Sequence, residues 1–134
     1  MLVRDVKPDD VALVFDSWMK SWRVNRYAGC ISNNAFYKVT RDNIENLVAR
    51  GAKIRVACLE SDVDTILGWV CYERLVDDTF CVHYVYVKDP YLKHGVGQKL
   101  AEELPPDGFF SYHCSQVRDY FPNYRWVPEI ARRK

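Results

Sequence analysis

The chain has 134 residues, of which 49% are hydrophobic and 28% are charged, and its formal net charge at pH 7 is +1. This length fits one domain with a core of its own, and the residue balance is that of a soluble globular protein. A net charge so close to zero gives no electrostatic argument for binding nucleic acid or an anionic membrane. We therefore expect a single domain, residues 1–134, that acts away from nucleic acid and membranes.

The cysteines are spread along the chain without a C-x-x-C pair or a cluster with histidines. They are Cys30, Cys58, Cys71, Cys81 and Cys114. All but the first stand in apolar, strand-like segments, where a free thiol behaves as a small hydrophobic side chain. The odd number and this placement argue against a disulfide framework and against a metal site. Residues 1–10 lack the apolar core of a signal peptide, and no apolar run approaches the about 20 residues that span a bilayer. We predict a cytoplasmic protein.

The first half of the chain predicts one short strand followed by two helices. Residues 2–6 alternate between apolar and polar side chains, as in a strand. Pro8 and the two aspartates after it open a helix, whose apolar residues recur at helical spacing as far as Trp22. After an irregular connection, a second helix is predicted over residues 35–50, and Gly51 ends it.

The second half predicts a strand meander and then alternating helices and strands. Three strands come first, over residues 53–59, 65–73 and 79–87, and their short connections require antiparallel neighbours. A helix after Gly97 ends at Pro105, and a strand over 109–114 then returns parallel to the third strand. A short helix, 115–121, and an extended segment, 124–127, complete the chain. The predicted order is β-α-α-β-β-β-α-β-α-β, an α/β (α+β) fold with a mixed, mostly antiparallel sheet flanked by helices.

The segment from residue 80 to 104 combines a strand, a loop with two glycines and the start of a helix. Its loop is His94-Gly95-Val96-Gly97. The first backbone N–H groups of a helix have no partner within the helix, and glycines let an anion approach them closely. Lys93 and His94 add hydrogen-bonding side chains. This arrangement predicts a site for the pyrophosphate of a nucleotide-containing cofactor, and the alternative is a tight structural connection.

The order of elements and the segment His83–Leu100, HYVYVKDPYLKHGVGQKL, resemble the GCN5-related N-acetyltransferase (GNAT) family over essentially the whole chain. In that family a strand leads into an Arg/Gln-x-x-Gly-x-Gly/Ala loop that binds acetyl-CoA. Gly95 and Gly97 match this signature, whereas Leu92 stands where the family has Arg or Gln. The small size and the two Ser-Trp pairs of the first helix also resemble compact members carried by tailed phages.

The resemblance implies that acetyl-CoA binds as the acyl donor. The strand before the loop would pair with the pantetheine arm in a gap toward the strand 109–114, as an added strand pairs with a free sheet edge. The loop would bind the pyrophosphate. The implied cofactor-binding residues are Tyr84, Val85, Tyr86, Val87, Lys93, His94, Gly95, Val96, Gly97 and Gln98.

The implied reaction is direct transfer of an acetyl group to a primary amine, which must first lose a proton. The family often places a glutamate base near the position of Cys81, and His83 faces the same side of the strand by alternation. Glu73, at the end of the neighbouring strand, is the second candidate base. The structural alternatives are a histidine bonded within the sheet and a solvated glutamate at a strand end.

The resemblance also implies an acid near the cofactor sulfur and an acceptor pocket. Tyr120 fits the place of the family's tyrosine acid, with Tyr124 as the near alternative and packing as the ordinary role of either. The backbone N–H near Val85 would polarise the thioester carbonyl. The aromatic residues beside the first interhelical connection can hold a cationic amine or simply pack on the sheet. These residues are Trp18, Trp22 and Tyr27.

The sequence leaves the acceptor open between a small molecule and a protein amine, and the oligomeric state open between monomer and dimer. Its second functional hypothesis is a GNAT-shaped binding or structural protein without turnover. Leu92 and the missing strand glutamate favour that alternative, whereas the intact glycines and Tyr120 favour the enzyme.

Overall fold

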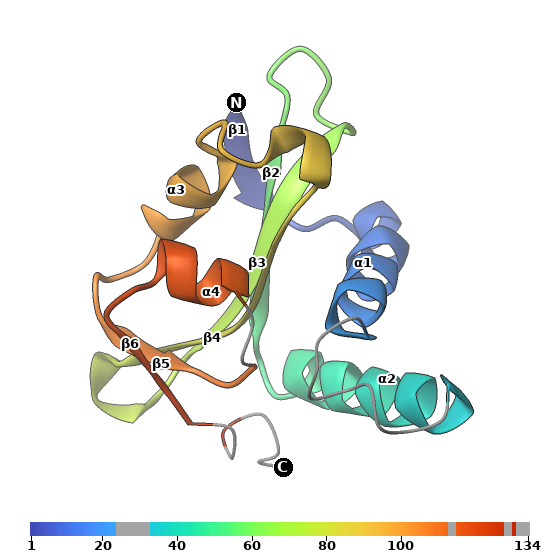
Figure 1. The fold of residues 1–134 in the computed structure, drawn as a ribbon, viewed down its shortest axis with the longest axis vertical. Coiled ribbons are helices and arrows are strands. Elements are labelled where there is room, and N and C mark those ends of the chain that lie inside the picture. Colours follow the sequence, from blue (N-terminus) through green and yellow to red (C-terminus); the bar gives the residue numbers. More distant parts are fainter. Residues whose placement is uncertain (24–32, 113–114, 128–129, 131–134) are drawn as a thin grey trace.

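The computed structural model describes residues 1–23, 33–112, 115–127 and 130 (Figure 1). The order of elements predicted from the sequence is confirmed in this part of the chain. The strands and helices are β1 (Leu2–Asp5), α1 (Val11–Arg23), α2 (Asn33–Ala49), β2 (Lys53–Cys58), β3 (Ile66–Arg74), β4 (Phe80–Val87), α3 (Val96–Ala101), β5 (Gly108–Phe110), α4 (Ser115–Tyr120) and β6 (Tyr124–Trp126). No helix within the described ranges is long and apolar enough to cross a membrane.

The strands form one six-stranded sheet in the order β1-β2-β3-β4-β5-β6. The pairings from β1 to β4 are antiparallel. Short turns connect β2 to β3 and β3 to β4, and such turns join antiparallel neighbours. The pairings of β4 with β5 and of β5 with β6 are parallel, because α3 and α4 carry the chain back between them. Figure 1 shows α1 and α2 on one side of the sheet and α3 and α4 on the other.

A β-bulge interrupts β4 at His83. Cys71 is opposite Tyr84, whereas the next residue of β3, Tyr72, is opposite Val82, so His83 is the extra residue of β4. A bulge bends its strand and re-aims the side chains around it. As a result both His83 and Tyr84 point to the side of α1 and α2, where their side-chain partners lie.

Helix α2 ends in a Schellman motif, which has two characteristic backbone hydrogen bonds. The Gly51 N–H donates to the Val48 carbonyl, and the Ala52 N–H donates to the Leu47 carbonyl. Gly51 has a φ of +107°, the left-handed conformation that this helix ending requires. The helix ends beside Gly51, as predicted. This ending sets the backbone position of Arg50, which lies between the last residue of α2 and Gly51.

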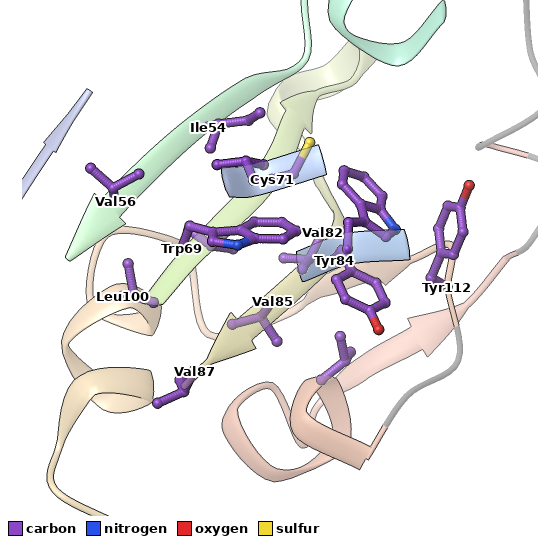
Figure 2. Packing of buried hydrophobic residues seen from close by; sticks show 14 of the residues in the cluster. Ile54, Val56, Trp69, Cys71, Val82, Tyr84, Val85, Val87, Leu100 and Tyr112 are labelled. Atoms are coloured by element: carbon purple, nitrogen blue, oxygen red, sulfur yellow. The ribbon is translucent and has the colours of Figure 1, made fainter. Parts of the chain in front are cut away.

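The core between α1 and the sheet is an aromatic cluster (Figure 2). Trp18 is completely buried and stacks on Tyr84, with ring centroids 5.1 Å apart and planes 13° apart. Trp69 and Tyr112 complete the cluster around Trp18, at centroid distances of 5.3 and 5.4 Å. Aromatic rings bury more apolar surface than any other side chains, so this cluster sets where α1 lies on the sheet.

The described cysteines behave as small hydrophobic residues. Cys58, Cys71 and Cys81 are free thiols with no exposed surface. Cys30 and Cys114 lie outside the described residues. Within the described ranges, no group of three or more His, Cys, Asp and Glu side chains could hold a metal ion.

Candidate functional site

Strands β4 and β5 pair over two residues and then separate. Cys81 is opposite Phe109 and Val82 is opposite Phe110, and the last backbone bond runs from the Ser111 N–H to the Val82 carbonyl at 3.2 Å. Among the described residues, the register of paired residues between the two strands ends at Val82 and Phe110. We call this point, after Val82 and Ser111, the strand fork.

The far end of the strand fork is spanned by a side chain of α4. The Val87 N–H donates to Oε1 of Gln116 at 2.9 Å, which places that N–H on the β5 side of β4. Backbone N–H groups of alternate residues point to the same edge of a strand, so the Val85 N–H points into the fork. No sequence pattern marks Gln116 beyond its place on the helix after β5.

The glycine-bearing loop enters α3 through Gly95. Gly95 has a φ of +85°, and a Cβ added to it would meet no atom within 4 Å, so the space over this residue is open. The first backbone bond of α3 runs from the Lys99 N–H to the Gly95 carbonyl, so the N–H groups of Val96, Gly97 and Gln98 precede it. The helix therefore begins before Gly97, whereas the sequence predicts a helix start after Gly97.

Two of the predicted loop residues have backbone features of their own. The His94 N–H donates to the Tyr91 carbonyl at 3.3 Å and is thus engaged in a turn. Lys93 has a φ of +64°, which is uncommon for a residue with a Cβ. The turn directs the chain from β4 to the start of α3.

Gly97 is covered by Tyr120. A Cβ added to Gly97 would lie 2.1 Å from Cζ of the Tyr120 ring, so a glycine is needed here for packing of α4 on α3. Tyr120 is half-buried, and burial together with the nearby Asp119 carboxylate raises the pKa of its hydroxyl. By contrast, the Tyr124 hydroxyl donates to the Pro105 carbonyl at 2.8 Å, and burial raises its pKa to about 12.

The two candidate bases meet across neighbouring strands. Nε2 of His83 lies 2.8 Å from Oε1 of Glu73, and Nδ1 of His83 lies 2.6 Å from Oγ of Ser111. The guanidinium of Arg50 donates to the same Glu73 oxygen and to the Ile130 carbonyl. We call Ser111, His83, Glu73 and Arg50 the buried chain. The sequence predicts His83 and Glu73 as candidates but does not indicate Ser111 or Arg50.

Charges within the buried chain are set by burial and pairing. Burial favours the neutral form of Glu73, but hydrogen bonds from His83 and Arg50 outweigh it and lower the pKa of the carboxyl. Burial lowers the pKa of His83, and the Glu73 carboxylate only partly opposes this. His83 is therefore neutral and Glu73 ionised near pH 7.

A cavity of about 600 Å³ lies beside Glu73, at the end of the buried chain away from Ser111. The Glu73 side chain is 12% exposed, whereas His83 has no exposed surface. The cavity is lined by Arg50, Glu73, Leu75, Val76, Thr79, Phe109, Val127 and Ile130. Glu73 is thus not a solvated strand end, and His83 is bonded within the sheet.

The predicted acceptor residues lie at different depths. Trp18 is completely buried in the aromatic cluster, where it packs against other side chains. Trp22 is half-buried and meets Tyr112 edge-on, at a centroid distance of 5.0 Å. Tyr27 lies outside the described residues. Trp22 is therefore the one of the three for which the structure describes exposed surface.

No family model and no curated protein matches this sequence. Many solved structures match its fold. A ribosomal-protein-alanine N-acetyltransferase from Brucella melitensis is 18% identical with a TM-score of 0.52, and covers 77% of this chain and 64% of its own. An acetyltransferase of the GNAT family from Staphylococcus aureus Mu50 is 16% identical with a TM-score of 0.54. The match covers 77% of this chain and 62% of the acetyltransferase.

The third example is described as histone acetyltransferase HPA2 and related acetyltransferase, from Corynebacterium glutamicum. It is 14% identical with a TM-score of 0.60, and covers 75% of this chain and 67% of its own. The chain has the GNAT fold. The resemblance read from the sequence is thereby confirmed at the level of fold. The chain spans less than two thirds of the length of the first two proteins.

Proposed function

We propose that this protein is an acetyl-CoA-dependent N-acetyltransferase that moves an acetyl group directly to a primary amine of a small molecule or a protein. The observation that carries the proposal is the strand fork, since it leaves the Val85 N–H on the β5 side of β4, beyond the last paired residues of the two strands. The GNAT fold, shared with acetyltransferases, supports the same activity.

The residues around the fork fit acetyl-CoA. A pantetheine arm carries amides that can pair with the backbone of β4 at Val85, as an added strand pairs with a sheet edge. The open space over Gly95 and the N–H groups at the start of α3 fit the pyrophosphate. The side chain of Leu92 cannot donate a hydrogen bond to a phosphate. Phosphate binding in this proposal therefore depends on backbone N–H groups and on the side chain of Lys93. When bound, acetyl-CoA supplies an activated acetyl thioester.

The side chains near the fork take three roles in this proposal. His83, held by Glu73, is the base that accepts the proton of the amine. The Val85 N–H donates to the oxygen on which negative charge develops. Tyr120 is the acid, because its hydroxyl has no acceptor among the hydrogen bonds of the described residues, whereas that of Tyr124 is bound to the Pro105 carbonyl.

Trp22, which contacts Tyr112 next to Ser111, is the proposed acceptor surface. A half-buried indole can hold a cationic amine against its face. The buried free thiols support a reducing compartment, and we propose the cytoplasm. Whether the protein works as a monomer or a dimer does not enter the chemistry of the site.

A binding protein without turnover is the second candidate. The complete burial of His83 favours it, because a base without exposed surface cannot touch an acceptor amine directly. The two functions differ in a simple pair of measurements. Both predict that acetyl-CoA raises the melting temperature, because a ligand that binds only the folded state stabilises it by about 2.7 kcal/mol at a hundred times its Kd.

The deciding measurement is release of free CoA thiol in the presence of a panel of primary amines. The enzyme predicts release that depends on the amine, whereas a binding protein gives the thermal shift alone. Absence of any thermal shift at millimolar acetyl-CoA would contradict both functions.

A further inference from the structure

We propose that Ser111 is the proton-relay residue of this site, whose hydroxyl carries the proton of the acceptor amine to Nδ1 of the buried His83. This inference rests on the proposed acetyltransfer. Ser111 lies at the strand fork, because its own N–H donates to the Val82 carbonyl at 3.2 Å, and 5% of its surface is exposed whereas His83 has no exposed surface.

His83 cannot reach an acceptor by itself. It has no exposed surface, and both ring nitrogens already have partners. Nε2 faces Glu73 at 2.8 Å, and Nδ1 faces the Ser111 hydroxyl at 2.6 Å. Any proton that reaches His83 from the strand fork along these contacts therefore passes over the Ser111 oxygen.

The donors and acceptors of the buried chain can be assigned from its charges. Ionised Glu73 only accepts hydrogen bonds, so the proton between it and His83 is carried by Nε2. A neutral imidazole carries one proton, which leaves Nδ1 as an acceptor. The Ser111 O–H must then donate to Nδ1, and its oxygen keeps lone pairs that can accept a proton from elsewhere. A serine, a histidine and a carboxylate in this order are the arrangement in which a hydroxyl is deprotonated by a base.

The relay balances its protons. An N–H bond of the amine breaks as a new O–H bond forms on Ser111, while the original Ser111 proton forms the Nδ1–H bond of His83. The resulting imidazolium is stabilised by the Glu73 carboxylate, which Arg50 holds in place. After the product leaves, the proton returns over the Ser111 oxygen to water, which restores the starting tautomer.

Among the described residues, the charged and titratable groups that face His83 come from β3, β4 and the end of α2. Glu73 on β3 favours the imidazolium, and Arg50 after α2 opposes it but is paired with Glu73. Cys81 on β4 lies 3.9 Å from Nδ1, and burial raises the pKa of its thiol to about 12, so it stays neutral. Cys81 therefore adds no charge at neutral pH.

The first test needs no substrate. Nitrogen-15 NMR of the apo protein at pH 7.5 should show His83 as a neutral ring with its proton on Nε2. In Ser111→Ala, the Nδ1 resonance should move toward that of a nitrogen without a hydrogen-bond donor. A doubly protonated ring, or a proton on Nδ1, would overturn the relay, because neither form can accept a proton from Ser111.

The second test is the pH dependence of kcat/KM for an amine that the protein acetylates. Ser111→Ala should lower kcat/KM about 100-fold near neutral pH, the contribution typical of proton transfer by a positioned side chain. The kcat/KM of Ser111→Ala should then increase about tenfold for each unit by which the pH is raised toward the pKa of the amine, because only the neutral amine can react. Ser111→Thr keeps the hydroxyl and should restore most of the rate.

Ser21→Ala is the matched control. Ser21 is a half-buried serine on α1 whose hydroxyl bonds the side chain of the adjacent β4 residue, Tyr84, at 2.9 Å. It should keep the wild-type pH profile. A profile of Ser111→Ala that matches wild type would overturn the relay alone. If wild-type protein acetylates no amine, the proposed function fails and the relay with it, so the two failures are distinguishable.

Discussion

Nε2 of His83 lies 2.8 Å from Oε1 of Glu73, across the two central strands of the sheet. Glu73 is opposite Cys81, and strand alternation from Cys81 puts His83 on the face on which Arg50 holds Glu73. Two residues that the sequence offered as separate candidates thus form one hydrogen-bonded pair. A buried pair of this kind links the stability of the protein to pH.

Acidification should destabilise the protein through both members of the pair. The folded pKa of His83 lies below the unfolded value of about 6.5, so as pH falls below that value the unfolded state binds more protons. The folded pKa of Glu73 is also lowered, so its contribution is complete above about pH 4.3 and is lost as pH falls through the folded pKa.

Urea unfolding between pH 7.5 and 5 measures this dependence. The free energy of unfolding should decrease as the pH is lowered. Below about pH 6.5, the free energy of unfolding of His83→Gln should decrease less steeply than that of wild type. Equal slopes in the variant and in wild type would show that His83 is not held neutral by burial. The remaining histidines, His94 and His113, are present in both proteins and cancel in the comparison.

Gly95→Glu should abolish acetyl-CoA binding. It places a carboxylate in the open space where the pyrophosphate is proposed to bind, and it also forces a Cβ into a left-handed conformation that costs about 1–2 kcal/mol. Gly51→Glu is the matched control, because Gly51 has a positive φ and open space as well but follows α2. Both variants should lose similar stability, and only the control should keep the thermal shift with acetyl-CoA. Persistent binding by Gly95→Glu would show that the loop assignment is wrong.

Tyr120→Phe should lower turnover with little effect on the affinity for acetyl-CoA, if its hydroxyl protonates the leaving thiolate. Tyr124→Phe loses the bond to the Pro105 carbonyl and should cost about 1 kcal/mol of stability while turnover is kept. Steady-state kinetics and thermal melts of the two variants make the comparison. Unchanged turnover in Tyr120→Phe would assign that tyrosine to packing.

Gly97→Ala should destabilise the protein by about 1–3 kcal/mol, the range expected when a methyl group is forced into a packed site. The added Cβ would collide with the Tyr120 ring. The double variant with Tyr120→Ala should be more stable than the sum of the two single changes predicts, because the second change removes the collision. Additive losses measured by urea unfolding would mean that the ring does not pack on Gly97.

The order of elements could be predicted because it depends on local signals. The strand pattern of residues 82–87, Gly51 at a helix end and the prolines at 105 and 106 each act over a few residues. The glycines of the loop likewise indicated a helix start after β4. The observed start of this helix differs from the predicted one, because Gly97 lies inside α3 rather than before it.

The composition of the buried chain could not be predicted because it depends on register. Strand alternation placed His83 on the same side as Cys81, but no pattern in the sequence marks the bulge that also turns Tyr84 to that side. The sequence predicts Ser111 within a strand over 109–114, whereas β5 ends at Phe110. Arg50 reaches Glu73 only through the packing of α2 on the sheet.

A crystal structure with CoA tests the central claim most directly. The account predicts the pantetheine arm in the strand fork with an amide paired to the backbone of Val85, the pyrophosphate over Gly95 and the start of α3, and the thiol on the Ser111 side. CoA bound away from the fork, or a fork closed by continued pairing of β4 with the chain after β5, would contradict it.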